Sequence, residues 1–362
     1  MAISIESNAW SDLPVPPGAV LAEELAARSM TQIELARRTG RPAQVINEIV
    51  RGKKSITHDT ALGLERVLGI AAQVWVNLEA IYQMTMARNQ ERERLAQQGT
   101  WLKNFPVGEL ENRNWITPQA DNGEKVWTLL KFLGIASFSD SWCEAAVGFR
   151  ITGSSKVSEG ALAAWLRQGE VDGHQVSTKS YSEPNFRDAL GRIRRLTSAD
   201  PSDFIPKIKL LCSEAGVAFV LTQELPKSGA NGAARWLNPE KALIQLSLRR
   251  RWADIFWFSF FHEAGHVLRH ELKTTYIERI GSIQQDEQAE AKADEFARDF
   301  LIPPGIWAQF MSAGDRTAEA IRDFAKEVTI DAGIVVGRLQ HEGLIPFNRM
   351  TQLKTRYEWV ED

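Results

Sequence analysis

Cysteine is scarce in this chain of 362 residues, which contains only Cys143 and Cys212. Two cysteines cannot build a disulfide framework, and neither lies in a Cys-x-x-Cys pattern, so any metal ligands are expected to come from other residue types. Both are expected to be buried thiols in a reducing cytoplasm. The sequence therefore argues against a small secreted domain held together by disulfides.

Long apolar runs and an excess of basic charge are also missing. No apolar stretch approaches the roughly 20 residues that a membrane helix requires, and residues 1–12 lack the basic start and apolar core of a secretory signal. We therefore expect a cytoplasmic protein with no membrane partner. The formal net charge of −3 excludes a uniformly basic coat for nucleic acid, but it leaves room for a local basic patch.

The strongest motif is the pentapeptide HEAGH, which begins at His262 and has the pattern His-Glu-x-x-His. Residues four apart lie on one face of a helix, so the imidazoles of His262 and His266 can bind the same Zn²⁺. Glu263 lies beside them and can take a proton from a metal-bound water. The alternative is a chance pair of histidines on a core helix, which a third ligand would exclude.

The helix that carries this motif is predicted from its apolar periodicity. An apolar face opposite the histidines is formed by Phe256, Phe260, Ala264 and Val267. Gly265 lowers the helix propensity by about 1 kcal/mol relative to alanine. A glycine at this position therefore indicates close packing against another backbone.

A third ligand is available in a second expected helix, where Glu290 and Asp294 are four residues apart. Glu290 can complete a His₂Glu site whose fourth position is left to water, and Asp294 can accept a hydrogen bond from a ligating imidazole. Glu287 is the alternative third ligand, and a solvated acidic helix face is the alternative to a metal site. His270 lies one turn beyond His266 and is expected to contact solvent or backbone.

HEAGH, followed by Glu-x-x-Ala-Asp-x-Phe-Ala-x-x-Phe-Leu-Ile-Pro over residues 290–303, resembles the ImmA/IrrE family of metallopeptidases. In that family the two histidines and the downstream glutamate bind zinc, and the glutamate of the motif is the general base. The resemblance therefore implies His262, His266 and Glu290 as zinc ligands and Glu263 as the base. The family usually has Leu-Leu before the proline, and Leu-Ile replaces it here.

Short helices separated by small turns are predicted for residues 14–85. Thr31 and Glu34 form a capping box at the start of one helix, and Gly40 ends that helix. A proline then begins the next helix, over residues 43–51. Two short helices joined by a glycine turn are typical of a helix-turn-helix.

Basic and amide side chains gather in the same segment. Between Arg37 and Lys54 there are six basic residues and one acidic residue. Amide groups suit the edges of bases, and basic groups suit phosphates. A helical bundle with a solvated basic loop is the alternative. The residues predicted to contact DNA are Gln32, Arg41, Gln44, Asn47, Arg51, Lys53 and Lys54.

The stretch that begins with PGAVLAEEL, continues with TQIELARRTGRPAQVINEIVRGKK and ends with WVNLEA resembles the Cro/C1-type domain of HigA-family antitoxins. It covers residues 12–85. The resemblance implies a homodimer that binds a palindromic double-stranded DNA operator through paired recognition helices, here residues 43–51. Arg-Pro replaces the commoner Val-Ser at the turn, so the individual base contacts stay open.

The whole chain is predicted to be mainly α with a small β-sheet, an α+β fold. An N-terminal helix-turn-helix bundle (residues 12–85) precedes a helical connector and middle subdomain (residues 86–200). A zincin-like metallopeptidase domain with C-terminal helices follows (residues 201–362). Within the middle subdomain, residues 161–167 are expected to form a helix that is followed by a loop rich in Gly, Asp and His.

Three strands are expected before the zinc helix, over residues 216–222, 232–237 and 242–248. An edge strand of this sheet can bind an extended peptide through main-chain hydrogen bonds. The three arginines at residues 249–251 are candidates to hold substrate charge, and a solvated helix start is the alternative.

The function favoured by these features is a DNA-binding transcriptional regulator with a fused zinc-dependent endopeptidase that cleaves a regulator, a toxin or itself. One alternative is a HigA-type antitoxin or repressor whose zincin domain is a non-proteolytic sensor or binding module. Another is a peptidase whose N-terminal helices serve only for dimerisation. The substrate, the scissile bond, the operator and the activating signal cannot be derived from the sequence.

Overall fold

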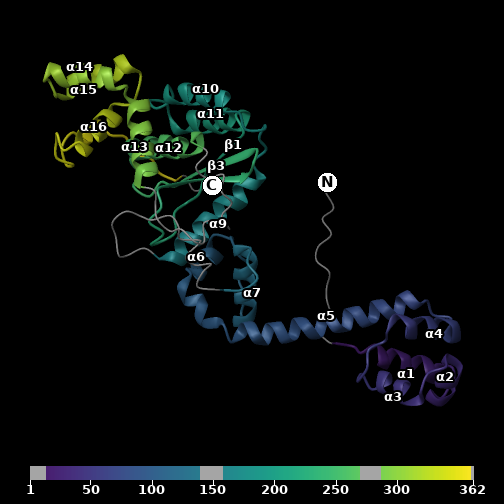
Figure 1. The fold of residues 1–362 in the computed structure, drawn as a ribbon. Coiled ribbons are helices and arrows are strands. Elements are labelled where there is room, and N and C mark those ends of the chain that lie inside the picture. The colour runs from purple at the N-terminus through teal and green to yellow at the C-terminus, as the bar shows by residue number, and fades with distance from the viewer. Residues whose placement is uncertain (1–13, 139–157, 270–286, 360–362) are drawn as a thin grey trace. The chain divides into compact units, whose positions relative to one another are not determined.

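The computed structural model describes residues 14–138, 158–269 and 287–359. Figure 1 shows that these ranges are mainly helical and contain one small sheet, which confirms the predicted fold class. Among the described residues, no helix has both the length and the apolar character needed to cross a membrane.

The chain divides into two compact units. The first contains residues 1–99 and 119–127, and the second contains residues 100–118 and 128–362. Helix α7 (Asn122–Leu133) begins in the first unit and ends in the second.

A bundle of helices forms the described part of the first unit: α1 (Pro17–Ala27), α2 (Gln32–Thr39), α3 (Ala43–Val50), α4 (His58–Leu68) and α5 (Ala72–Ala96). Apolar residues from different helices meet in one core, because each amphipathic helix must bury its apolar face. Its fully buried members include Leu21, Leu35, Ile46 and Trp75. The bundle thus has a core of its own.

Helix α2 begins and ends at the predicted residues, but only half of the predicted capping box is present, because the Glu34 carboxylate pairs with Arg37 and Arg38 and not with the backbone of Thr31. The hydroxyl of Thr31 accepts a hydrogen bond from the Glu34 N–H at 3.1 Å, and Gly40 ends α2 with a φ of +67° in the left-handed region. Gly18 of α1 lies against α3, where an added Cβ would be 1.9 Å from the carbonyl oxygen of Ile49. The glycine thus allows α1 to lie directly against the end of α3.

The second unit contains a sheet of three strands: β1 (Val217–Leu221), β2 (Gly232–Asn238) and β3 (Lys241–Leu246). These are the strands that the sequence predicts. Their order is β1-β3-β2, with β1 parallel and β2 antiparallel to β3. Strand β2 therefore lies at one edge, where its outer backbone groups are not paired within this sheet.

Helix α9 (Glu159–Gln175) lies on one face of the sheet and α12 (Ala253–Leu268) on the other. Successive side chains of β3 point to opposite faces, so Leu243 and Gln245 contact α9 while Ile244 joins the core around α12. The sheet thus forms the middle layer between two helices.

The loop expected after residue 167 is not present, because α9 continues to Gln175. Gly169 and Gly173 face the sheet. An added Cβ would lie 1.9 Å from Cδ of Gln245 at Gly169, and 2.9 Å from Cδ1 of Leu243 at Gly173. The glycines allow the helix to approach the strands closely, so the prediction of a loop was wrong.

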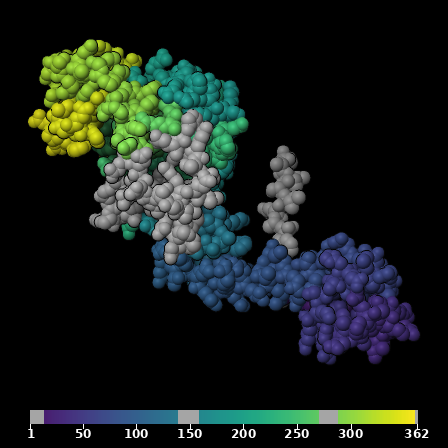
Figure 2. Space-filling view, viewed as in Figure 1, coloured from purple at the N-terminus to yellow at the C-terminus, as the bar shows by residue number. Residues whose placement is uncertain are grey.

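The second unit contains further helices, of which α13 and α16 pack against α12. The further helices are η1 (Gly99–Asn104, whose first residue belongs to the first unit), α6 (Val107–Asn112), α10 (Glu183–Arg194), α11 (Pro201–Glu214), α13 (Glu287–Leu301), α14 (Pro304–Ala313), α15 (Ala318–Val328), α16 (Ala332–His341) and η3 (Thr351–Leu353). In the space-filling view, α14 to α16 gather at one end of this unit, in yellow-green to yellow (Figure 2).

The main core of the second unit is aromatic and has α12 at its centre. Trp257, Phe260 and Phe261 of α12 are fully buried and pack against Phe204 and Phe219 from α11 and β1. Such rings bury large apolar areas, so their packing stabilises the position of α12 in the core.

The expectation of buried thiols holds for Cys212, which lies in this core. Burial raises the pKa of its thiol, so it stays protonated and unreactive at neutral pH. Cys143 lies outside the described residues.

Candidate metal centre

Two antiparallel neighbours, α12 and α13, carry the residues of the candidate metal centre. His262, Glu263 and His266 belong to α12, and Glu290 and Asp294 to α13. The ring of Phe261 on α12 stacks on that of Phe300 on α13, with the ring centroids 5.1 Å apart.

Gly265 allows this close approach of the two helices. A Cβ added to it would lie 3.1 Å from Cδ1 of Phe296 and 3.4 Å from the Cα of Ala293, both on α13. The predicted packing of Gly265 against another backbone is therefore confirmed. A larger side chain here would push α13 and its carboxylates away from the histidines.

Four ligand atoms converge between the helices. The Nε2 atoms of His262 and His266 are 3.1 Å apart. The carboxylate of Glu290 places one oxygen 3.3 Å from Nε2 of His262 and the other 3.5 Å from Nε2 of His266. Ligands at about 2.0–2.1 Å from a tetrahedral zinc ion lie about 3.3 Å from one another. The spacing therefore fits a zinc ion bound by two imidazoles and one carboxylate.

Asp294 lies behind the first histidine. Its Oδ1 is 2.8 Å from Nδ1 of His262, so the carboxylate can accept the Nδ1–H bond that leaves Nε2 free to bind a metal. Asp294 sits one turn from Glu290 on the same helix. The alternative ligand Glu287 begins α13, but its side chain and all of His270 lie outside the described residues.

The carboxylates control the protonation of the imidazoles. Burial lowers the pKa of His262, but Asp294 and Glu290 outweigh this effect and raise it to about 10. For His266, burial likewise lowers the pKa while the hydrogen bond to Glu290 raises it, and the net shift is upward. Hydrogen bonds from the two histidines hold the pKa of Glu290 below its usual range. The negative carboxylates thus attract positive charge into the centre, and a bound cation would supply it.

Glu263 is buried beside the ligands, with 8% of the residue exposed. Burial raises the pKa of its carboxyl above the usual value, although the two histidines and the backbone N–H of Ala234 lower it. A carboxylate with a raised pKa is a better proton acceptor near neutral pH. The residue thus has both the location and the basicity that a general base needs.

The sequence does not predict that Gly232 and Ala234 bring edge strand β2 against Glu263. A Cβ added to Gly232 would lie 2.9 Å from Oε1 of Glu263 and 2.7 Å from Cδ2 of Leu246. A glycine inside a predicted strand signals a close approach of this kind. The pattern did not identify which group approaches.

The first unit positions the residues that the sequence assigns to DNA contact around α2 and α3. The side-chain amide of Asn47 on α3 donates to the amide oxygen of Gln32 on α2 at 3.1 Å. Gln44 is exposed and donates to Glu48 at 2.8 Å. The two amides of Gln32 and Asn47 are therefore held together where α2 meets α3.

The basic residues of the same set differ in their partners. Arg41 forms an ion pair with Asp59, and Lys54 lies 3.9 Å from Glu48. Arg51 and Lys53 are exposed in the turn that follows α3. Exposed ion pairs contribute at most about 1 kcal/mol, so Glu48 does little to hold Lys54 in place.

Comparison with known proteins identifies two domains. Residues 21–75 match the helix-turn-helix family and residues 220–339 match the IrrE N-terminal-like domain, a peptidase family. Virulence-associated protein I of Dichelobacter nodosus is 38% identical over 79 residues, which cover 22% of this chain and 73% of that protein.

Two solved structures resemble the same part of the chain. An addiction module antidote protein of the HigA family from Coxiella burnetii is 34% identical. The match covers 23% of this chain and 92% of the antidote protein, with a TM-score of 0.22. The antitoxin HigA of Pseudomonas aeruginosa, solved with the higBA promoter, is 31% identical. The match covers 23% of this chain and 90% of the antitoxin, with a TM-score of 0.22. The N-terminal part of the chain therefore belongs to the helix-turn-helix family, together with virulence-associated protein I, and the C-terminal part contains an IrrE N-terminal-like domain.

Proposed function

We propose that this chain is a DNA-binding transcriptional regulator with a fused zinc-dependent endopeptidase. The observation that carries the proposal is the convergence of His262, His266 and Glu290 beside the buried carboxylate of Glu263. Three protein ligands leave one position of a tetrahedral zinc ion open, as catalytic zinc sites require. The match to a peptidase family supports the same conclusion.

In this mechanism zinc would polarise the scissile carbonyl and lower the pKa of a bound water towards about 7. With zinc held by His262, His266 and Glu290, the carboxylate of Glu263 would accept a proton from the attacking water and would later pass it to the leaving amine. Asp294 holds the imidazole of His262 in the tautomer whose Nε2 faces the metal position. Strand β2 supplies an open edge beside Glu263, to which an extended peptide can bind through main-chain hydrogen bonds.

The first unit is proposed to bind an operator in double-stranded DNA as a homodimer, with α3 as the recognition helix. One of its structural relatives was solved with its promoter. The amides of Gln32, Gln44 and Asn47 are suited to base edges, and Arg51, Lys53 and Lys54 to phosphates. Replacing Lys53 and Lys54 with Gln is expected to weaken binding to genomic DNA fragments and to reduce the salt dependence by about one unit per lysine.

The substrate of the peptidase is proposed to be a regulator, a toxin or the chain itself. Cleavage is tested by incubating the zinc-loaded chain with the proteins encoded beside its gene and identifying new termini by mass spectrometry. Glu263→Gln should retain zinc but abolish cleavage. If a true substrate is still cut at the same bond by this variant, Glu263 is not the base.

A second function is favoured by the similarity to antidote proteins of the HigA family. In this alternative the chain is an antitoxin or repressor, and the zincin domain senses or binds without cutting. Such a protein would neutralise the product of a neighbouring toxin gene equally well with glutamate or glutamine at position 263. Neutralisation that requires Glu263 would favour the peptidase.

A further inference from the structure

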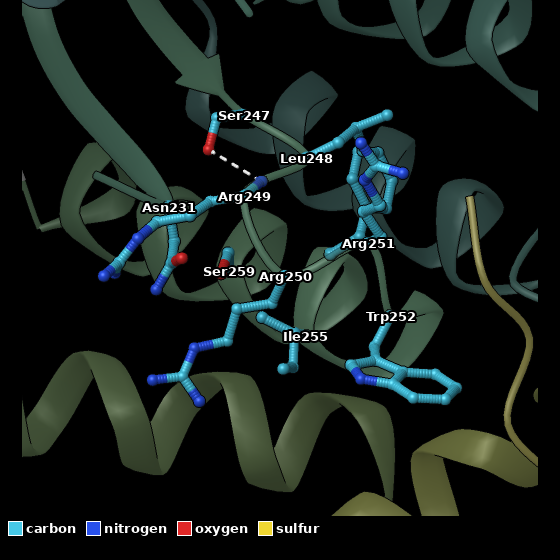
Figure 3. Close-up of a pocket in the computed structure, with 10 residues that line it drawn as sticks. Asn231, Ser247, Leu248, Arg249, Arg250, Arg251, Trp252, Ile255 and Ser259 are labelled. Atoms are coloured by element: carbon cyan, nitrogen blue, oxygen red, sulfur yellow. Dashed lines mark hydrogen bonds between the residues drawn. The ribbon is translucent and has the colours of Figure 1, made fainter. Parts of the chain in front are cut away.

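A shallow hollow lies next to the proposed catalytic centre, at the start of α12 (Figure 3). Ser259 lines it and lies one helical turn before Glu263 on α12. Asn231 lines it from the other side and directly precedes Gly232, which contacts Glu263. The hollow therefore adjoins the base along two elements, the zinc helix and the edge strand.

The charge of this hollow is positive. Three consecutive arginines line it, and none of its lining residues is acidic. Two acids of α12 lie outside the lining: Asp254 is buried and paired with Lys354 at 2.7 Å, and Glu263 is buried one turn after Ser259. Nothing in the lining neutralises the arginines, so the hollow attracts anions.

The three arginines differ in what their side chains do. Figure 3 shows Arg249 and Arg250 extending to the same side, with Arg249 beside Asn231, while Arg251 extends the other way. Arg249 donates one hydrogen bond to the carbonyl of Gly229 at 2.8 Å, which leaves its other donors available. Arg250 is exposed and makes no ion pair within the described residues. Arg251 lies 3.8 Å from Glu358.

One polar side chain that lines the hollow has a buried oxygen without a hydrogen-bond partner. The side-chain oxygen of Asn231 is buried and has no hydrogen-bond partner in the described part of the chain. Burying an amide group without a partner costs free energy, so this position suits a ligand that brings a hydrogen-bond donor such as a peptide N–H. The backbone of Arg249 is fixed in turn, because its N–H donates to the hydroxyl of Ser247 at 3.3 Å.

We propose that this hollow is a subsite for an acidic side chain of the peptide substrate, held by Arg249 and Arg250 close to the scissile bond. The inference rests on the proposed peptidase function and names its substrate class, a peptide with Asp or Glu at one fixed position beside the cleaved bond. A guanidinium binds a carboxylate with two parallel hydrogen bonds, and a glutamine of the same shape cannot replace that charge.

Matched peptide hydroxamates test the subsite without a known substrate. The hydroxamate occupies the open zinc position, and the neighbouring side chain is Glu, Gln or Lys. One series carries this side chain on the N-terminal side of the hydroxamate and a second series carries it on the C-terminal side. Binding to the zinc-loaded full chain is measured by calorimetry at low and high salt.

In one of the two series we expect the Glu probe to bind about tenfold more tightly than the Gln probe, and less so at high salt. The Arg249→Gln/Arg250→Gln double variant should bind both probes equally. Arg250→Glu, a change at an exposed residue, should prefer the Lys probe. Arg251→Gln is the matched control and should keep the preference for Glu.

Equal binding of the Glu and Gln probes in both series would overturn the subsite and leave the peptidase proposal intact. A preference that persists in the double variant, or that Arg251→Gln also removes, would likewise overturn it. If the zinc-loaded chain binds none of the hydroxamates, the metal has no open position. That result would overturn the proposed function and the subsite together.

Discussion

Single residues from distant parts of the chain give Glu263 its proposed role as a base. Its burial, the N–H of Ala234 and the close approach of Gly232 come from packing against β2 and not from the motif itself. The carboxylate of Glu263 has little room beside Gly232. Its orientation therefore depends on residue 232 having no Cβ.

Replacing Gly232 with Ala should displace Glu263, because the new Cβ would lie 2.9 Å from its Oε1. We expect zinc content to stay the same and the kcat of cleavage to fall about 100-fold, since small displacements of a catalytic group are costly. Gly191→Ala is the control, because nothing lies within 4 Å of its added Cβ. Unchanged kcat in Gly232→Ala would show that the position of the carboxylate is not limiting.

Replacing Asp294 with Asn should weaken zinc binding about 10- to 100-fold, because the His262 imidazole loses the carboxylate that orients it. Competition with a zinc-specific chelating dye measures this change. Glu295→Gln alters the next residue of α13, whose side chain lies 3.8 Å from Arg298, and should leave the affinity unchanged. Equal losses in the two variants would indicate a general effect of charge on α13.

At the scale of elements, the position of α13 depends on Arg194 of α10. Its guanidinium donates to the carbonyls of Phe300 and Leu301 at 2.8–3.0 Å, where α13 ends. Burial lowers the pKa of Arg194, but the group stays charged at neutral pH. The cation therefore caps the C-terminal end of the helix that carries Glu290.

Arg194→Met should lower the free energy of unfolding by about 2 kcal/mol, because the last carbonyls of α13 lose a charged donor. Zinc affinity should fall with it, since Glu290 is less firmly placed. Urea unfolding and dye competition measure the two effects. The control Arg195→Met removes an exposed side chain with one long hydrogen bond of 3.4 Å to Gly191, and stability losses of the same size there would contradict the capping role.

The start of α12 is held by a buried ion pair between Asp254 and Lys354, at 2.7 Å. Burial raises the pKa of Asp254, and Lys354 partly opposes this rise. Lys354 also donates to Gln340 of α16 at 3.1 Å. The pair thus connects the zinc helix, α16 and the C-terminal segment.

Lys354→Met should raise the pKa of Asp254 further and destabilise the fold in a pH-dependent way. The folded protein then keeps a proton that the unfolded chain releases above its ordinary pKa, so the free energy of unfolding falls as pH rises through the window between the two values. We expect a loss of about 3 kcal/mol at pH 8 and a smaller one at pH 5, measured by urea unfolding. The double variant Asp254→Asn/Lys354→Met should lose this pH dependence, and a loss independent of pH in Lys354→Met would contradict the account.

Elements with strong local signals were predictable from the sequence. The apolar periodicity of α12, the cap of α2 at Thr31 and the three β-rich runs each specify their element through neighbouring residues. The error at α9 has a physical cause, because Gly169 and Gly173 resemble loop residues locally but are needed for contact with the sheet. Tertiary packing overrides local preference at such positions.

The candidate site was predictable only in part for the same reason. The spacing of the motif brings His262 and His266 to one face of a helix, and the second helix offers Glu290 and Asp294. The approach of β2 to Glu263 and the pairing of Arg41 with Asp59 join residues distant in sequence. No local pattern encodes such contacts, so Gly232 was missed and the partner of Arg41 was not foreseen.

At the scale of the whole molecule, the two proposed activities belong to separate units. The helix-turn-helix lies in the first unit around its own core, and the zinc ligands, the base and the arginine-lined hollow all lie in the second. Each unit can therefore keep its fold when the site of the other is altered. Operator binding should accordingly survive the loss of a zinc ligand such as His266.

The zinc content of the purified full chain after dialysis, measured by elemental mass spectrometry, shows directly whether the two histidines and Glu290 bind the metal. We expect one zinc per chain in the wild type, in Glu263→Gln and in the surface control Glu295→Gln, and almost none in His266→Ala or Glu290→Gln. Retention of one zinc per chain by both His266→Ala and Glu290→Gln would contradict this expectation, because the ion would then be bound elsewhere.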